Sequence, residues 1–448
     1  MKSKASDQFS PSRLAQITPI VRGLLANSTA NEDMPYEPVI LKSMTSKDAI
    51  DGFDKDIRLS SVEALTTSSA GKKIGPSRAR SRDGLKPTLQ SLPKSARPPL
   101  FIDVAEEGAE PEKLRKQLCD AILDYSARHN SKPDIICLTG MGILYVDRAN
   151  HTKSRVKRGK EPPVKLGAKY LAPRSTWGLE LPLRNKVALV TGAAGAIGYG
   201  ICRGLLETGC YLAATDLPGK KLDDFVADLK LRGGDRVIGV AIDVTDKKSV
   251  NEGFENVVQA WGGIDIVVVN AGIPLVANLK DIDLDAFRKL EKVNIEGALL
   301  TLTEAARLFI LQGTGGDIIV ISTKNVPAPG AGFGAYSATK AACHQLGRIA
   351  SIELAQYGVR VNMVAPDGVF SEGKYKSGLW EQIGPDRMRA RGLDKKGLQE
   401  YYRNRNLLKL TVTGRHVANA VLFFATHQTP TTGATIPVDG GLPDATPR

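Results

Sequence analysis

Hydrophobic and polar positions follow a sustained pattern only in the C-terminal part of the chain. From Lys186 onward, short apolar runs alternate with stretches of helical period, and turn residues separate them. Continuous apolar runs are typical of parallel strands that helices cover on both faces. The seven runs are KVALVT, YLAATD, RVIGVAID, IDIVVVN, DIIVIS, VRVNMVA and ATIPV. Because parallel strands need crossover helices, the pattern predicts an α/β domain with a Rossmann-type, doubly wound, seven-stranded parallel sheet.

The stretches between these runs predict the covering helices. Their expected ranges are Ile197–Glu207, Lys220–Arg232, Lys247–Trp261, Leu284–Leu311, Ala335–Tyr357 and Gly414–Thr426. The connection over residues 367–410 is much longer than the others and is rich in Lys and Arg.

The first 182 residues show weaker patterns. Residues 1–98 are rich in Ser, Lys and Pro, and they predict a basic N-terminal region that is partly disordered. Over residues 99–182 we expect a small α/β segment with the strands PLFIDV and DIICL around an amphipathic helix, followed by a basic linker. The regular domain then occupies residues 183–448.

Composition limits the class of protein. Of 448 residues, 42% are hydrophobic and 24% are charged, which excludes wholesale disorder. There is no apolar stretch of membrane-spanning length and no secretory signal, so we expect a cytoplasmic protein without membrane association. The five cysteines form no CxxC pair and indicate reduced thiols; we expect neither a disulfide framework nor a metal site.

The net charge of +13 is concentrated in the first part of the chain. Basic residues cluster over residues 72–97 and 153–174, where they could attract nucleic acid or phosphorylated ligands. Aromatic residues do not alternate with the basic ones, as base stacking would require. We therefore interpret both runs as solvated linker and do not expect a nucleic-acid partner.

A glycine-rich turn, TGAAGAIG, follows the first strand. Glycines in this place let the backbone approach a pyrophosphate at the N-terminus of the next helix. An ordinary strand-to-helix turn is the alternative, but the strand–turn–helix setting favours a dinucleotide. The candidate cofactor-binding residues of the turn are Gly192, Gly195, Ala196, Ile197 and Gly198.

Further candidates for cofactor binding follow the next strands. Asp216 ends the second strand, where a carboxylate can accept both ribose hydroxyls of an adenosine and would repel the extra phosphate of NADP; the alternative is a helix N-cap. The position favours NAD as cofactor over NADP. Asp243 and Val244 would flank the adenine. The triplet that ends the fourth strand lies where the sheet edge meets the ligand, and it comprises Asn270, Ala271 and Gly272.

Tyr336 and Lys340 lie four residues apart, on one face of the same predicted helix. Such a pair also occurs by chance, but this one follows a strand, the hydroxyls of Ser322 and Thr323, and a Gly/Pro loop. A cation beside a buried phenol favours the ionised phenol. A tyrosine of this kind can exchange the proton of an alcohol while a hydride moves to or from a nicotinamide.

At this point residues 183–448 resemble the short-chain dehydrogenase/reductase family. The signals occur in order: TGAAGAIG, Asp216, NAG, VNIEG, VIST, YSATK, VRVNMVAPDGV and TGATIPVDGG. The resemblance implies that Tyr336 is the acid/base and that Lys340 binds the nicotinamide ribose and tunes Tyr336. It also implies that Asn294 holds a proton-relay water, that a hydroxyl near residue 323 polarises the carbonyl, and that the protein is a homo-oligomer, a tetramer or dimer.

Two positions depart from the family pattern. Ala196 stands at the family's middle glycine, and Gly195 lies one position early. The polarising residue is usually Ser, whereas here its spacing from the tyrosine falls on Thr323, and Ser322 would face the opposite side of the strand. We therefore assign the polarising hydrogen bond to Thr323 and still expect cofactor binding.

A narrower resemblance is to the dehydrogenase half of bifunctional rhamnulose-phosphate aldolase/lactaldehyde dehydrogenase-type proteins. It rests on STKNVPAPGAGFGAYSATKAA, PDGVFSEGKYKSGLW, EYYRNRNLLK and VDGGLPDATPR, and the region before Lys186 resembles the distal end of the aldolase part. Only His129 and His151 occur in that region, which is too few for the histidine cluster of a zinc aldolase. We interpret it as a truncated, non-catalytic aldolase remnant.

The leading hypothesis is an NAD-dependent oxidoreductase that interconverts a secondary alcohol or hydroxyaldehyde and its carbonyl form. We expect a small-molecule substrate derived from a sugar, a polyol or a sugar phosphate. Basic residues over 367–410 suit a hydroxy acid or a sugar phosphate, although a solvated lid or a subunit contact explains them equally well. The alternatives are a retired dehydrogenase fold that binds NAD as a scaffold or sensor, and a bifunctional aldolase/dehydrogenase.

Overall fold

The computed structural model describes residues 11–29, 33–44, 98–104, 110–138, 141–147, 181–370 and 374–443. The basic runs predicted as linker, 72–97 and 153–174, lie outside the described residues. The chain divides into two compact units: residues 1–25 with 39–153 form the smaller one, and residues 26–38 with 154–448 form the larger one.

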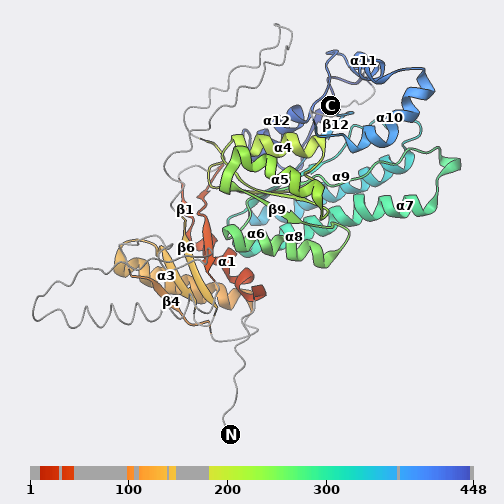
Figure 1. Ribbon diagram of the computed structural model, residues 1–448. Helices are drawn as coiled ribbons and strands as arrows, with labels where there is room; N and C mark the ends of the chain where they lie inside the picture. The colour runs from red at the N-terminus through yellow and green to blue at the C-terminus, as the bar shows by residue number, and fades with distance from the viewer. Residues whose placement is uncertain are drawn as a thin grey trace, which may run out of the picture. The chain divides into compact units, whose positions relative to one another are not determined.

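The described residues of the smaller unit form a four-stranded sheet and the helices α1 and α3 (Figure 1). The strand order is β3-β6-β5-β4, in which β4 and β5 are parallel and the other pairs antiparallel. Its elements are α1 (Pro11–Leu25), β3 (Leu41–Met44), β4 (Leu100–Ile102), α3 (Pro111–His129), β5 (Ile135–Leu138) and β6 (Gly142–Val146). The two strands and the helix expected over residues 99–138 are therefore present, and β6 adds a strand that the sequence pattern did not indicate.

Helix α1 lies in the region for which the sequence predicts low order. Leu14, Ile17 and Val21 recur at helical spacing along it, and all three are buried. A stripe of this kind stabilises a helix only when it packs against something. The polar composition of residues 1–98 as a whole hides this short periodic pattern from a reading of the sequence. The tertiary contacts of the smaller unit stabilise the helix.

The larger unit contains a seven-stranded, fully parallel sheet of the order β13-β12-β11-β10-β7-β8-β9. This confirms the predicted doubly wound Rossmann-type architecture. The strands are β7 (Val187–Val190), β8 (Tyr211–Asp216), β9 (Val237–Ala241), β10 (Ile266–Val269), β11 (Gly316–Ile321), β12 (Val359–Pro366) and β13 (Thr435–Val438). The two central strands, β7 and β10, are buried at every residue, as coverage on both faces requires.

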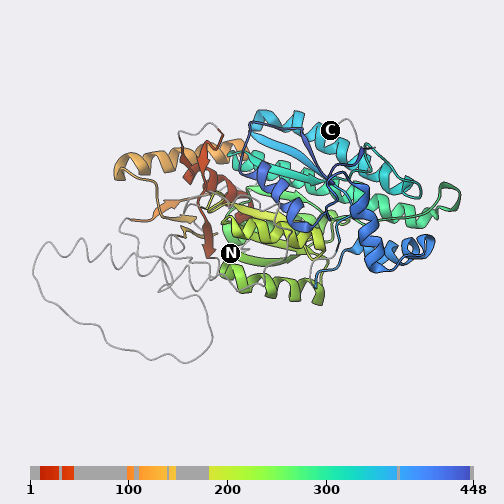
Figure 2. The ribbon, with the colours of Figure 1, turned by 90° about the horizontal axis from the view of Figure 1, so that it is seen from above.

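Helices cover both faces of this sheet. On one face α12 packs against α4, beside α5; on the other, α8 lies between α6 and α9 (Figure 1). Figures 1 and 2 show α10 and α11 at the end of the unit where α7 begins. The bounds are α4 (Ala196–Glu207), α5 (Lys220–Gly233), α6 (Lys247–Trp261), α7 (Leu284–Glu291), α8 (Gly297–Gln312), α9 (Gly334–Leu354), α10 (Gly378–Arg391), α11 (Lys395–Arg405) and α12 (Gly414–Ala425). Within the described ranges, no helix has both the length and the apolar character that a bilayer crossing demands.

The single helix expected over Leu284–Leu311 is divided by a π-helical turn, Lys292–Glu296, between α7 and α8. A π turn widens the helix by one residue and is frequent at functional sites. Asn294 lies in this turn and is 1% exposed.

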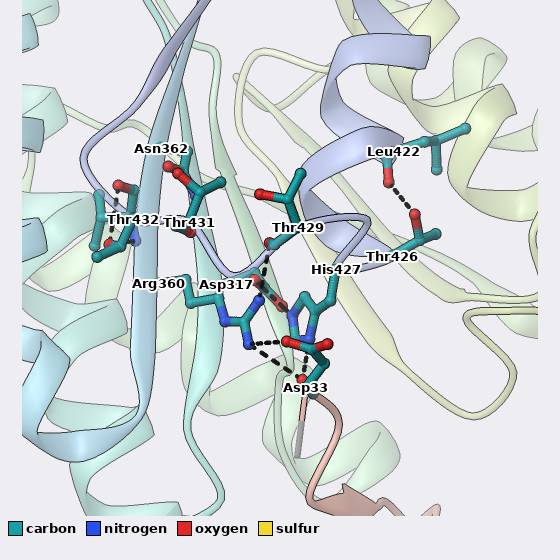
Figure 3. A network of polar contacts seen from close by, with 11 residues as sticks. Asp33, Asp317, Arg360, Asn362, Leu422, Thr426, His427, Thr429, Thr431 and Thr432 are labelled. Atoms are coloured by element: carbon teal, nitrogen blue, oxygen red, sulfur yellow. Dashed lines mark hydrogen bonds and ion pairs between the residues drawn. The ribbon is translucent and has the colours of Figure 1, made fainter. Parts of the chain in front are cut away.

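A short hairpin at the start of the larger unit is attached to the amino end of the sheet. It pairs β1 (Asn27–Ser28) with β2 (Tyr36–Glu37), and Asp33 lies in its turn. Figure 3 shows His427 between this turn and Asp317 of β11: Nδ1 contacts the Asp33 carbonyl, and Nε2 lies 2.8 Å from Asp317 Oδ2. Arg360 of β12 contacts the Asp33 carboxylate at 3.3 Å.

We expect Asp317→Asn to lower the free energy of unfolding of the larger unit by about 2–3 kcal/mol, because it removes one partner of a buried charge-assisted hydrogen bond. Thermal unfolding followed by circular dichroism measures the effect. Asp285→Asn is the control: its exposed pair with Arg288, at 3.0 Å, should contribute less than about 0.5 kcal/mol. Equal melting temperatures for the two variants would contradict the role given to His427.

Candidate active site

The glycine-rich turn between β7 and α4 is shaped by two close backbone approaches. Gly192 has φ +59°, and a Cβ on it would lie 2.8 Å from Ala271 Cα. A Cβ on Gly198 would lie 2.3 Å from the Ala193 carbonyl oxygen. Neither position accepts a side chain without moving backbone. Gly195 is different, because a Cβ there would meet nothing within 4 Å.

Gly195 is the N-cap of α4, and Ala196 is the first helical residue. Ala196, which stands where the family has glycine, is 1% exposed, so its methyl group packs in the core. The Ala196 amide donates to the Lys376 carbonyl at 3.2 Å, and the part of the turn that stays exposed is at Gly195 and Ile197. A helix N-terminus offers such a surface to an anion. Ile197 also borders the cavity here.

Thr191 and Asn270 fix this turn from the neighbouring strand. The Thr191 hydroxyl accepts hydrogen bonds from the amides of Asn270 and Ala271 at 3.0 and 3.1 Å. The Asn270 side chain donates to the carbonyl oxygens of Thr191 and Gly192 at 2.9 and 2.8 Å. The polar atoms of these residues are used within the protein, so both residues shape the site.

Two acidic residues lie at the carboxyl ends of β8 and β9. Asp216 accepts from the amides of Ala194 and Leu217, both at 3.0 Å, and its side chain remains 15% exposed at the cavity wall. Lys221 approaches it to 3.7 Å. Asp243 accepts from the Thr245 amide at 2.9 Å, and Val244 borders the same end of the cavity.

Tyr336 and Lys340 lie on α9, and both border the cavity. Lys340 is 6% exposed, and its Nζ donates to the Ile321 carbonyl at 3.0 Å. A Cβ on Gly272 would lie 3.2 Å from Lys340 Nζ and 3.2 Å from Asn294 Oδ1. The ammonium therefore lies at the carboxyl edge of the sheet, next to the triplet that ends β10.

The Asn294 side chain connects three parts of the site. Its Oδ1 accepts from the Ile273 amide at 2.9 Å, while its Nδ2 donates to the Ile273 carbonyl at 3.0 Å and to Thr339 Oγ1 at 3.2 Å. These contacts join the loop after β10 to α9. The geometry gives this side chain a positioning role.

Ser322 and Thr323 follow β11 and have different partners. Ser322 Oγ lies 2.9 Å from His344 Nδ1, and burial, with a smaller contribution from Arg348, lowers the pKa of His344. Thr323 Oγ1 accepts from the Asn325 amide at 3.2 Å and can still donate its own proton. His344 is a partner that sequence reasoning missed, because no spacing rule connects the end of a strand with the next helix.

One cavity of about 1490 Å³ contains all the residues that the sequence singled out at the sheet edge, apart from Asn294. A pocket for one drug-sized ligand usually measures about 300–1000 Å³, so this cavity has room for a dinucleotide and a small substrate together. The open cradle at Gly195, the carboxylate of Asp216 and the volume of the cavity fit such a cofactor.

The cavity extends to side chains of the long basic connection over residues 367–410. Trp380, Arg387 and Arg391 of this connection border it, as does Asn325. The sequence offered the basic residues and Trp380 of this segment as candidates, but it gave no sign of Asn325.

Comparison with known proteins agrees with the fold. The short chain dehydrogenase family model matches residues 186–382. The "Uncharacterized oxidoreductase YuxG" of Bacillus subtilis is 33% identical over 288 residues, which are 64% of this chain and 41% of that protein; the matched part is thus less than half of that relative. "Short-chain dehydrogenase reductase 4" of Arabidopsis thaliana is 30% identical over 59% of this chain and 85% of its own length.

A solved structure is similar over the same region. Sorbitol-6-phosphate 2-dehydrogenase SrlD from Erwinia amylovora superimposes with a TM-score of 0.52 at 27% identity, covering 57% of this chain and 98% of its own. Enzymes of this family use NAD(H) or NADP(H) as coenzyme. The chain therefore belongs to the short-chain dehydrogenase/reductase family and is an oxidoreductase.

Proposed function

We propose that this protein is an NAD-dependent oxidoreductase that interconverts a sugar- or polyol-derived secondary alcohol or hydroxyaldehyde and its carbonyl form. The observation that carries the proposal is the placement of Tyr336, Thr323 and Lys340 along one cavity with the glycine-rich turn. The similarity to a sorbitol-6-phosphate 2-dehydrogenase supports a polyol-type substrate.

The residues of the cavity assign parts of the cofactor to parts of the chain. Gly195 and Ile197 at the N-terminus of α4 would hold the pyrophosphate, Asp216 the adenosine ribose, and Lys340 the nicotinamide ribose. Asp243 and Val244 would flank the adenine. When bound, the cofactor supplies the acceptor or donor of the hydride.

The chain's own residues handle the proton and the oxygen of the substrate. The phenolic oxygen of Tyr336 would take the proton from the alcohol, or return it in the reverse direction. The Thr323 hydroxyl would donate a hydrogen bond to the reacting oxygen, since Ser322 already contacts His344. Asn294 and the Ile321 carbonyl hold α9 and Lys340 in place.

Tyr336→Phe should reduce turnover by about 10³-fold, because the variant lacks the group that exchanges the proton. Its affinity for NAD should stay within about twofold. NADH absorbance and isothermal titration calorimetry measure the two quantities, and Tyr357→Phe, at an exposed tyrosine, is the control. Full activity of Tyr336→Phe would exclude the acid/base role, and NAD binding by the wild type without turnover of any sugar or polyol would favour the scaffold hypothesis.

Asp216→Asn should lower the preference for NAD over NADP by about tenfold or more, because the variant removes the charge that repels a 2′-phosphate while keeping a hydrogen-bond acceptor. The ratio of kcat/KM values for the two coenzymes measures the change. Asp223→Asn, which neutralises an exposed carboxylate of α5 outside the cavity, is the matched control. A ratio that Asp216→Asn leaves unchanged would show that another residue selects the coenzyme.

For the region before Lys186 we propose, on the sequence resemblance alone, an aldolase remnant without catalysis. Within the residues that the structure describes there is no group of three His, Cys, Asp or Glu side chains that could hold a metal ion; His151 lies outside them. Stoichiometric zinc in the purified protein, measured by mass spectrometry, would contradict the proposal and favour a bifunctional lyase.

A further inference from the structure

We propose that the far end of the cavity binds the phosphate group of a phosphorylated polyol or sugar, through Arg387 and Arg391. The inference rests on the oxidoreductase function proposed above, and it adds the charge of the substrate and the residues that recognise it. Both guanidinium groups border the same cavity as Tyr336, and both side chains are half-buried.

The two arginines lie four residues apart on α10 and therefore on one face of that helix. Like charges at this spacing repel each other. Within the described residues, no carboxylate forms an ion pair with either side chain, and the buried Arg387 Nε has no hydrogen-bond partner. A bound anion would remove the repulsion and satisfy the unused donor.

A third guanidinium at this end is already neutralised. Arg405 of α11 donates from Nη2 to both oxygens of the Asp367 carboxylate, one of them at 2.5 Å. The field of all three guanidinium groups reaches Tyr402: burial raises the pKa of this phenol, and Arg405, Arg387 and Arg391 oppose the rise. Two positive charges remain uncompensated, which matches the charge of about −2 on a phosphate monoester better than the single charge of a carboxylate.

The other basic side chains of residues 367–410 do not compete for this role. Lys374 pairs with Asp228 at 3.0 Å, and Lys376 pairs with Glu381 at 2.9 Å. Arg389 and Arg403 are exposed and do not border the cavity. Among the basic side chains of residues 367–410 that border the cavity, Arg387 and Arg391 are thus the two without a carboxylate partner in the described part of the chain.

The position of Arg387 relative to Tyr336 bears on the shape of the substrate. Arg387 Cζ lies 4.7 Å from the centre of the Phe333 ring, and that ring lies 6.1 Å, centre to centre, from the ring of Tyr336. Phe333 therefore contacts both the Arg387 guanidinium and the ring of Tyr336. A phosphate held by Arg387 and a reacting oxygen beside Tyr336 then belong to different groups of one substrate molecule.

Two further polar atoms on residues that border the cavity suit the hydroxyl-bearing part of such a substrate. Asn325 is 6% exposed, yet its Oδ1 has no hydrogen-bond partner, and the same holds for Trp380 Nε1. Both residues border the cavity. Since an unpaired buried polar atom is costly, an acceptor at Asn325 and a donor at Trp380 are explained by a ligand with hydroxyl groups.

The surrounding aromatic residues hold these groups in place. Trp380 stacks on Phe370 at 4.5 Å between ring centres and meets the edge of Tyr402 at 4.6 Å. The Arg391 guanidinium lies 4.8 Å from the centre of the Tyr401 ring. Arginines stacked on aromatic rings lose less side-chain freedom when they bind an anion.

The test compares neutral and phosphorylated forms of the same polyol with the full-length chain and NAD. The probes are sorbitol with sorbitol 6-phosphate, mannitol with mannitol 1-phosphate, and gluconate as the carboxylate. We expect kcat/KM to be at least about tenfold higher for a phosphorylated polyol than for its neutral partner, the difference residing in KM. Equal values within each pair, or a preference for gluconate over every phosphate ester, would overturn the proposal.

The variants Arg387→Gln and Arg391→Gln should each lower kcat/KM for the phosphorylated polyol by about tenfold and leave the neutral polyol unchanged. Arg403→Gln is the matched control, with the same loss of charge on α11 outside the cavity. Arg387→Lys, which keeps the charge without the two-pronged geometry, should recover part of the loss and guards against a general folding defect. A variant of the pair that loses activity equally on both forms would refute phosphate recognition.

Calorimetry separates this inference from the proposed function. The Tyr336→Phe variant, saturated with NAD, should bind sorbitol 6-phosphate or mannitol 1-phosphate, and adding Arg387→Gln should weaken that binding about tenfold. Binding that depends on Arg387, together with no NADH formation by the wild type, would keep the phosphate site and refute the oxidoreductase mechanism. NADH formation by the wild type, together with binding that Arg387→Gln does not weaken, would keep the oxidoreductase mechanism and refute the phosphate site.

Discussion

The whole site depends on the hydrogen bonds that join Thr191 and Asn270 across the two central strands. At this point of the sheet the chain leaves β7 toward one face and β10 toward the other, so that a crevice opens between the two connections. The Thr191 hydroxyl and the Asn270 amide satisfy the backbone groups that would otherwise be unpaired there. The glycine-rich turn keeps its shape because the neighbouring strand holds it.

Lys340 and the helix α9 that carries it are held by a second set of contacts that also begins at this edge. The buried Lys340 ammonium needs an acceptor, and the Ile321 carbonyl at the end of β11 supplies one. The π turn places Asn294 where one amide group reaches both Ile273 and Thr339. Strand, turn and helix therefore fix one another, and the position of Tyr336 follows from this rigid arrangement.

Charge is distributed unevenly along the cavity. Asp216 and Asp243 make the end near β8 and β9 acidic, whereas Arg387 and Arg391 make the opposite end basic. This difference in charge would orient ligands that carry hydroxyl groups at the acidic end and an anion at the basic end. The reverse orientation would bring like charges together or leave buried polar groups unpaired. Helices α10 and α11 thus add basic side chains to a cavity whose acidic end is formed at the carboxyl edge of the sheet.

The sequence by itself determined the seven strands, most of the covering helices, the glycine-rich turn and the Tyr336–Lys340 pair, because each depends on residues that are close along the chain. Apolar runs, glycine spacing and helical periodicity are local properties, and parallel strands force their carboxyl ends to one edge. The tertiary structure alone decided that a π turn precedes α8, that Ser322 contacts His344 and that α1 forms. It also decided which arginines border the cavity and that Arg405 among them is paired with Asp367. These features depend on contacts between residues far apart in the sequence, whose hydrogen-bond partners and burial are fixed only when the elements pack together.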